Sequence, residues 1–228
     1  MNASAPPGGP GKHIVIVAHP EPASFTLSVA NVYCAAAAKR GHHVLLRDLY
    51  RMSFDPVLKA SERLPDQPFK AAPDVAAELA LLAGASAFVL VYPIWFGTPP
   101  AILKGYVERV FGAGFIPSRL GARLGRPAHP LLGGRQLVSL SSSGSSRQWL
   151  AEQGASQSLQ TIFEGYLARA FWMSSPRHVH FGSISDGMAE EVVQAHLREV
   201  ERQATLICDR IENAAATGSG SASDAALD

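Results

Sequence analysis

HIVIVA, at residues 13–18, is a short run of mostly β-branched residues near the start of the chain. Apolar residues follow one another without polar alternation, so both faces of an extended segment here would avoid water. The run ends at the dipeptide His19-Pro20. This pattern predicts a buried strand of a parallel sheet, which helices cover on both sides.

Four further runs share this character, and helical periods separate them. Strands are expected at 43–48 (HVLLRD), 87–92 (AFVLVY), 136–141 (QLVSLS) and 177–182 (RHVHFG). Helices are expected from Ser24 to Gly41, from Val75 to Ala83 behind an Asp74 cap, from Thr98-Pro99 onward, over about 156–173, and from Val193 to Ile211. The alternation predicts an α/β doubly wound parallel sheet with helices on both faces.

The composition is that of one globular domain, with 228 residues, 47% hydrophobic, 17% charged and a net charge of +1. The small net charge argues against nucleic acid as a partner, and no apolar run approaches the roughly 20 residues of a membrane span. We expect one domain over 12–213 between a disordered arm (1–11) and a disordered tail (214–228). The start lacks the apolar stretch of a secretory signal, so Cys34 and Cys208 are expected to be free thiols in a cytoplasmic protein.

The connection after the first strand is the first candidate site, because open parallel sheets bind ligands beyond the carboxyl ends of their strands. Ser24 can cap the following helix, which leaves the N–H groups of Phe25, Thr26 and Leu27 free. These amides and the helix dipole suit a phosphate, and His19 can add a donor. An ordinary capped helix with a loop histidine is the alternative interpretation.

The connection after the third strand carries large aromatic side chains where a polar turn is usual. Trp95 and Phe96 could form a wall for a flat conjugated ring, and the neighbouring backbone could supply donors to its edge. Aromatic packing over the end of the sheet is the alternative. The candidate binding residues here are Pro93, Ile94, Trp95, Phe96 and Gly97.

The connection after the fourth strand is rich in serine. Its candidate residues, Ser141, Ser142, Ser143 and Gly144, can turn amides and hydroxyls toward one acceptor edge. Such donors suit a ring whose polar edge gains negative charge on reduction. A flavin is one example, because negative charge develops at its N1–C2=O side when it is reduced. The signal is weak alone, and three such connections on one sheet edge make it stronger.

Three segments resemble the flavodoxin-like NAD(P)H:quinone oxidoreductase family, the DT-diaphorase type: AHPEPASF (18–25), RDLYRMSFDPVL (47–58) and YPIWFGTPPAILKGYVERVFGAGF (92–115). The resemblance covers about residues 12–212. It implies a flavodoxin-like fold with strand order 2-1-3-4-5 and a homodimer that holds FMN or FAD. It also implies hydride transfer from NAD(P)H through flavin N5 to a quinone-like, nitro or azo acceptor in a two-electron, ping-pong reaction.

The same resemblance places the flavin phosphate near His19 and residues 24–27, and the ring against residues 93–97 and 141–144. One departure concerns protons. The mammalian members carry a tyrosine and, six residues later, a histidine, where this chain has Trp149 and Ala155. An indole cannot usefully exchange a proton, so the catalytic residue stays open, with Trp149 a weak candidate.

Two other functions remain open: a flavin-binding regulatory protein with little turnover, and a one-electron carrier of flavodoxin type. His178 and His180 share one face of the fifth strand, but no carboxylate or cysteine is close in sequence, so no metal site is expected. Lys104 and Arg109 are interpreted as surface or dimer charges rather than catalysts.

Overall fold

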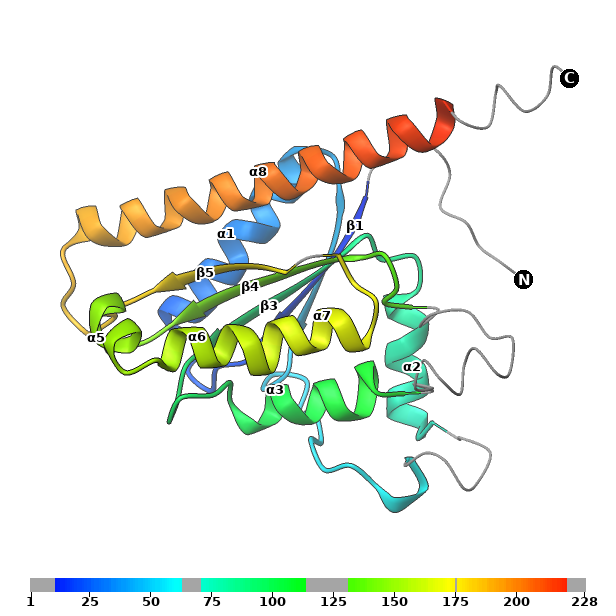
Figure 1. The fold of residues 1–228 in the computed structure, drawn as a ribbon, viewed down its shortest axis with the longest axis horizontal. Helices are drawn as coiled ribbons and strands as arrows, with labels where there is room; N and C mark the ends of the chain where they lie inside the picture. The colour runs from blue at the N-terminus through cyan, green and yellow to red at the C-terminus, as the bar shows by residue number, and fades with distance from the viewer. Residues whose placement is uncertain (1–10, 63–70, 114–130, 175, 221–228) are drawn as a thin grey trace, which may run out of the picture.

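One five-stranded parallel sheet forms the centre of the computed structural model, which describes residues 11–62, 71–113, 131–174 and 176–220 (Figure 1). The strand order β2-β1-β3-β4-β5 confirms the predicted flavodoxin-like, doubly wound fold. All five strands lie within one residue of their predicted bounds: β1 (Lys12–Val17), β2 (His43–Asp48), β3 (Ala87–Pro93), β4 (Gln136–Ser142) and β5 (Arg177–Phe181).

Helices cover both faces of the sheet. In Figure 1, α1 (Phe25–Lys39) and α8 (Glu190–Gly220) lie on one side, and α2 (Pro73–Leu82), α3 (Ala101–Tyr106), α6 (Ala155–Leu159) and α7 (Tyr166–Ala170) lie on the other. The remaining elements are the 3-10 turn η1 (Ala60–Glu62), the π-turns η2 (Val107–Phe111) and η3 (Gln160–Gly165), and α5 (Arg147–Glu152).

The side-chain alternation of β1 divides the apolar interior into two cores. Ile14 and Ile16 pack into the core under α3 and α7, whereas Val15 and Val17 pack into the core under α1 and α8. The register pairs Val17 with Asp48 on one side and with Val91 on the other. The carboxyl ends of the strands therefore meet at one edge, where the connections converge.

Two helix starts differ from the prediction. The third helix begins at Ala101 with Pro100 as its N-cap, not at Pro99, because a residue that precedes a proline is driven out of the helical region. The second begins at Pro73, and Asp74 lies in its first turn instead of capping it.

The region predicted as one helix over 156–173 consists of α6, η3 and α7, with α5 as an additional helix before it. The last helix continues to Gly220, past the boundary expected at residue 213. Residues 1–10 of the expected arm and 221–228 of the expected tail lie outside the described residues. Within the described ranges, no helix is both long and apolar enough to cross a membrane.

Arg109 was expected to be a surface or dimer charge, and the structure shows instead that it is buried. Its side chain is 1% exposed and lies 2.9 Å from Glu62 Oε1 and 2.8 Å from Asp74 Oδ2. Lys104, one turn earlier, is exposed and pairs with Glu108. The π-turn η2 adds a residue to the helical turn, which changes the face on which Arg109 falls.

Candidate functional site

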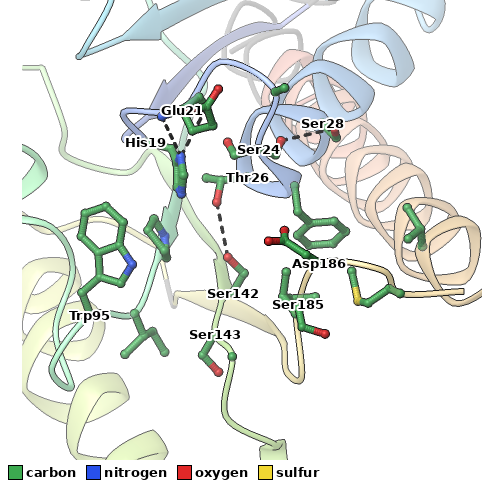
Figure 2. A pocket seen from close by; sticks show the side chains of 18 of the residues that line it. His19, Glu21, Ser24, Thr26, Ser28, Trp95, Ser142, Ser143, Ser185 and Asp186 are labelled. Atoms are coloured by element: carbon green, nitrogen blue, oxygen red, sulfur yellow. Dashed lines mark hydrogen bonds between the residues drawn. The ribbon is translucent and has the colours of Figure 1, made fainter. Parts of the chain in front are cut away.

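A pocket of about 550 Å³ opens at the carboxyl ends of β1, β3 and β4 (Figure 2). Its volume falls in the range of roughly 300–1,000 Å³ that small-molecule sites occupy. The three candidate connections all reach it. The predicted residues that line it are His19, Ser24, Phe25, Thr26, Pro93, Ile94, Trp95, Ser142, Ser143 and Gly144.

The first connection presents a capped helix start to the pocket. Ser24 is the N-cap of α1, and its Oγ accepts the N–H of Leu27 at 3.3 Å. The N–H groups of Phe25 and Thr26 belong to the first helical turn, where backbone donors have no partner within the helix. His19 Nδ1 lies 3.1 Å from the N–H of Glu21 and 3.3 Å from its carbonyl oxygen, so the backbone of Glu21 orients the ring through this nitrogen.

The second connection is held by backbone hydrogen bonds at both ends. The N–H of Ile94 donates to the Ser142 carbonyl at 2.7 Å, and Trp95 and Thr98 exchange backbone bonds of 3.0 and 3.1 Å. The turn between them needs φ of +50° at Phe96 and +82° at Gly97. Trp95 is 39% exposed, and its ring lies 5.6 Å from the ring of His19 at the pocket wall (Figure 2).

The third connection joins the first across the floor of the pocket. The hydroxyls of Ser142 and Thr26 lie 3.4 Å apart (Figure 2). Ser143 is 8% exposed and also lines the pocket, and Gly144 continues the wall. Hydroxyl-bearing residues from two elements thus line the same pocket as the first turn of α1.

Four predicted binding residues do not line this pocket. Leu27 is 7% exposed and packs in the core, Phe96 projects fully into solvent, and Gly97 lines a second, apolar hollow. Ser141 is fully buried and is hydrogen-bonded to two histidines of β5. Trp149 lies on α5, is 51% exposed and is not one of the lining residues.

The connection between β5 and α8 supplies a part of the wall that the sequence did not indicate. Asp186 projects into the space beside Ser185 (Figure 2), and its carboxylate can accept hydrogen bonds from ligand hydroxyls. The SISDG segment (183–187) is a polar turn after a strand, which is a signal for a binding loop. This signal was missed, because the strand before it was expected at the edge of the sheet. The additional lining residues are Glu21, Ala23, Ser28, Ile184, Ser185, Asp186, Gly187, Met188 and Val193.

The combination suits an elongated ligand with an anionic end and a flat aromatic end. The helix start at Ser24 favours an anion, and the indole of Trp95 offers an apolar face for a ring. Between them, hydroxyl groups and Asp186 can bind a polar chain. The chemistry of these donors therefore fits a phosphorylated, ring-bearing cofactor.

The chain is similar in sequence and fold to several known proteins. An uncharacterized NAD(P)H oxidoreductase of Haemophilus influenzae is 34% identical over 149 residues, which are 64% of this chain and 71% of that protein. NAD(P)H dehydrogenase [quinone] 1 of Cavia porcellus is 32% identical over 120 residues, 45% of this chain and 43% of that protein. The chain thus matches less than half the length of this second relative.

A solved structure of similar fold is the NAD(P)H:quinone oxidoreductase from Methanothermobacter marburgensis, with a TM-score of 0.73 at 22% identity, covering 86% of this chain and 96% of that one. An FMN-dependent NADH-azoreductase of Bacillus anthracis in complex with FMN aligns with a TM-score of 0.61 at 16% identity, covering 87% of this chain and 100% of that one. The Flavodoxin_2 family model, described as a flavodoxin-like fold, matches residues 11–204. The chain therefore belongs to the Flavodoxin_2 family.

Proposed function

We propose that this chain is a flavin-dependent NAD(P)H oxidoreductase that reduces quinone-like acceptors. The observation that carries the proposal is the convergence of three connections on one pocket, with a free helix start at Ser24 and an aromatic face at Trp95. The names of the relatives, NAD(P)H oxidoreductase and NAD(P)H dehydrogenase [quinone], support the same reaction class.

A flavin bound here would supply the hydride chemistry, taking two electrons from the nicotinamide and passing them to the acceptor. The first turn of α1 would hold its phosphate, Trp95 would cover its ring, and the loop from Ser142 to Gly144 would donate to its polar edge. We favour FMN over FAD for two reasons. FMN ends in a phosphate, and the helix start at Ser24 would bind that end of the ligand. Two of the similar structures are FMN complexes.

We also propose a homodimer. Phe96, Ile162 and Tyr166 are large apolar side chains with exposures of 107%, 73% and 61%. Ile162 also lines an apolar hollow of about 560 Å³ between the start of α3 and η3. A second copy of the chain could cover this surface, and light scattering after size-exclusion chromatography would give the mass of a dimer or of a monomer.

Purified protein tests the cofactor and the reaction together. We expect a yellow protein that releases FMN, identified by mass spectrometry, and that oxidises NADH or NADPH when menadione is added. Cys34 and Cys208 are free, which suits the reducing cytoplasm where we place this activity. A colourless protein that binds neither FMN nor FAD in titration would contradict the proposal.

A flavin-binding regulatory protein is the second candidate. The departure at Trp149 and Ala155 favours it, because the family's proton-handling pair is missing there. Turnover at background level with every acceptor in a panel of quinones, nitro compounds and azo dyes, despite full flavin occupancy, would select this alternative.

A further inference from the structure

A series of side-chain contacts runs from a buried carboxyl group to the wall of the pocket: an ion-pair contact comes first, and three hydrogen bonds follow. Glu164 Oε2 lies 3.4 Å from His178 Nδ1. His178 Nε2 lies 2.7 Å from Ser141 Oγ, which is 2.9 Å from His180 Nδ1. His180 Nε2 is in turn 3.0 Å from Ser143 Oγ, and Ser143 lines the pocket.

The strand register explains why these groups meet. Ser141 of β4 is paired with His180 of β5, and Ser139 with His178. Alternate residues of a strand share a face, so the histidines and serines of the two strands point to the same side of the sheet. The π-turn η3 covers that side and brings Glu164, which is 1% exposed, against His178.

The hydrogen-bond partners give the chain a direction. Ser143 Oγ donates to the Ser145 carbonyl at 2.9 Å, so it accepts from His180 Nε2. His180 Nδ1 then accepts from Ser141 Oγ, which accepts from His178 Nε2. Both rings are thereby assigned as neutral Nε2–H tautomers. Every donor points away from Glu164 and toward the pocket.

Burial decides which member of the chain holds an exchangeable proton near neutral pH. It lowers the pKa of His178 to about 4, with further lowering by His180 and by Arg147 of α5. Burial also lowers the pKa of His180 to about 4, again with a contribution from Arg147. The carboxyl group behaves oppositely: burial raises the pKa of Glu164 to about 7, against smaller lowering effects of the Ser139 and Tyr92 hydroxyls.

Tyr92 completes the environment of the carboxyl group from β3. Its hydroxyl donates to Glu164 Oε1 at 3.1 Å, which leaves Oε2, the oxygen nearer His178, to carry the acidic proton. The side-chain amide of Gln160 is hydrogen-bonded to His178 Nδ1 at 3.3 Å, so Glu164 Oε2, at 3.4 Å, shares this acceptor with it and replaces it when the carboxyl group donates its proton.

We propose that Glu164, His178, Ser141, His180 and Ser143 form the proton route of this site, with Glu164 as the proton store. This inference rests on the proposed function. Reduction of a quinone needs one hydride and one proton: a cofactor bound in the pocket would supply the hydride, and the route supplies the proton to the oxygen of the acceptor. It takes over the task for which Trp149 and Ala155 are unsuited.

The transfer is a concerted shift in which every group passes on one hydrogen and receives another. Glu164 Oε2 gives its proton to His178 Nδ1, while His178 Nε2–H passes to Ser141 and the Ser141 hydroxyl hydrogen passes to His180 Nδ1. His180 Nε2–H then passes to Ser143, whose hydroxyl hydrogen turns from the Ser145 carbonyl to the acceptor in the pocket. Both rings end as Nδ1–H tautomers, and a proton from solvent in the emptied pocket reverses the shifts.

The first test follows the histidines of the flavin-free protein with ¹⁵N spectra between pH 5.5 and 8.5. We expect the His178 and His180 signals to remain those of neutral rings and to shift with a midpoint near pH 7, the pKa of Glu164. In Glu164→Gln this midpoint should vanish. The control, Glu78→Gln, removes a buried carboxyl that is also bonded to a tyrosine, at 2.7 Å from Tyr106, but lies away from the pocket; it should keep the midpoint.

The second test separates the two half-reactions of the flavin-loaded protein by stopped flow. In Glu164→Gln and His180→Phe, reaction with menadione should slow by roughly 10²-fold or more, as for loss of a general acid, and lose its pH dependence near pH 7. The nucleotide half-reaction, which needs no proton from the protein, should stay within about two-fold.

Several outcomes would overturn the route. One is a Glu164→Gln protein whose histidines titrate as in the wild type, and another is a pair of variants that react with menadione at the wild-type rate. Slowing in Glu164→Gln without slowing in His180→Phe would remove the histidines from the path. Failure to bind any flavin would instead contradict the proposed function. The ¹⁵N titration would still show whether Glu164 is coupled to His178 and His180.

Discussion

Trp95 is the residue whose side chain has the clearest single role in ligand binding. Its ring stands at the pocket wall beside His19 and is 39% exposed, so a flat ligand can cover it. We expect Trp95→Ala to weaken FMN binding on the order of 10-fold, from the lost aromatic contact. Fluorescence titration of the flavin-free protein with FMN measures this.

Trp149→Ala is the matched control, because Trp149 is 51% exposed and does not line the pocket. Its FMN affinity should equal that of the wild type. Equal losses in the two variants would contradict the position assigned to the ring.

At the scale of elements, two helices begin with the same cap, and only one of them faces the pocket. Ser24 Oγ accepts from Leu27 N at 3.3 Å, and Ser146 Oγ accepts from Trp149 N at 3.1 Å. Loss of either cap in Ser24→Ala or Ser146→Ala should cost about 1 kcal/mol of unfolding free energy. Only Ser24→Ala should also weaken FMN binding, which urea unfolding and FMN titration together resolve.

If Ser146→Ala reduced FMN affinity as much as Ser24→Ala, the effect would be general destabilisation, and α1 would lose its assigned role as phosphate site. Inorganic phosphate offers an independent check. It should compete with FMN in the wild type and compete less well in Ser24→Ala.

The elements also show how far the sequence could predict this site. Strand runs such as HIVIVA are explicit, and because parallel strands end at one edge, the sequence alone could bring together the connections of Ser24, Trp95 and Ser142. It could not add the loop of Asp186, because no sequence pattern says how far the chain after an edge strand turns back over its neighbours.

The histidines of β5 show a second limit. Their common face followed from the alternation of a strand, but their partners depend on the register between β4 and β5, which pairs His180 with Ser141. Glu164 lies in a π-turn, which has more residues per turn than the 3.6 of an α-helix. The helical period of the sequence therefore does not predict the face on which its carboxyl group lies. Burial of Arg109 was missed for the same reason.

At the scale of the whole molecule, Arg109 of η2 links three elements, because it forms ion pairs with Glu62 of η1 and Asp74 of α2. Its ion pair with Glu62 is almost fully buried, with side-chain exposures of 1% and 2%. Arg109→Met should lower the unfolding free energy by roughly 3–5 kcal/mol, because it leaves a buried carboxylate without its counter-charge. Lys104→Met, on the same helical segment, removes an exposed pair with Glu108 and should cost less than about 1 kcal/mol in the same urea experiment. Similar losses would show that burial of the pair is unimportant.

The pH dependence of stability should reflect the buried histidines. Burial lowers the pKa values of His13, His178 and His180 to about 4, so as pH falls below their ordinary value of 6.5 the unfolded chain takes up protons that the folded chain refuses, and stability is lost. Glu164 acts in the opposite sense, because its raised pKa of about 7 lets the folded state bind a proton first as pH falls toward 4.5.

These contributions set the size of the effect between pH 7 and pH 5. At about 1.4 kcal/mol per pKa unit, and with the partly exposed His180 counted at half, the histidines lose roughly 5 kcal/mol while Glu164 returns roughly 2. Urea unfolding of the flavin-free protein should therefore show a net loss of about 3 kcal/mol in the wild type. In Glu164→Gln the compensation is gone, so the loss should steepen to about 5 kcal/mol. If the unfolding free energy fell equally between pH 7 and pH 5 in the two proteins, the pKa of Glu164 would not be raised. Glu164 could then not be the proton store.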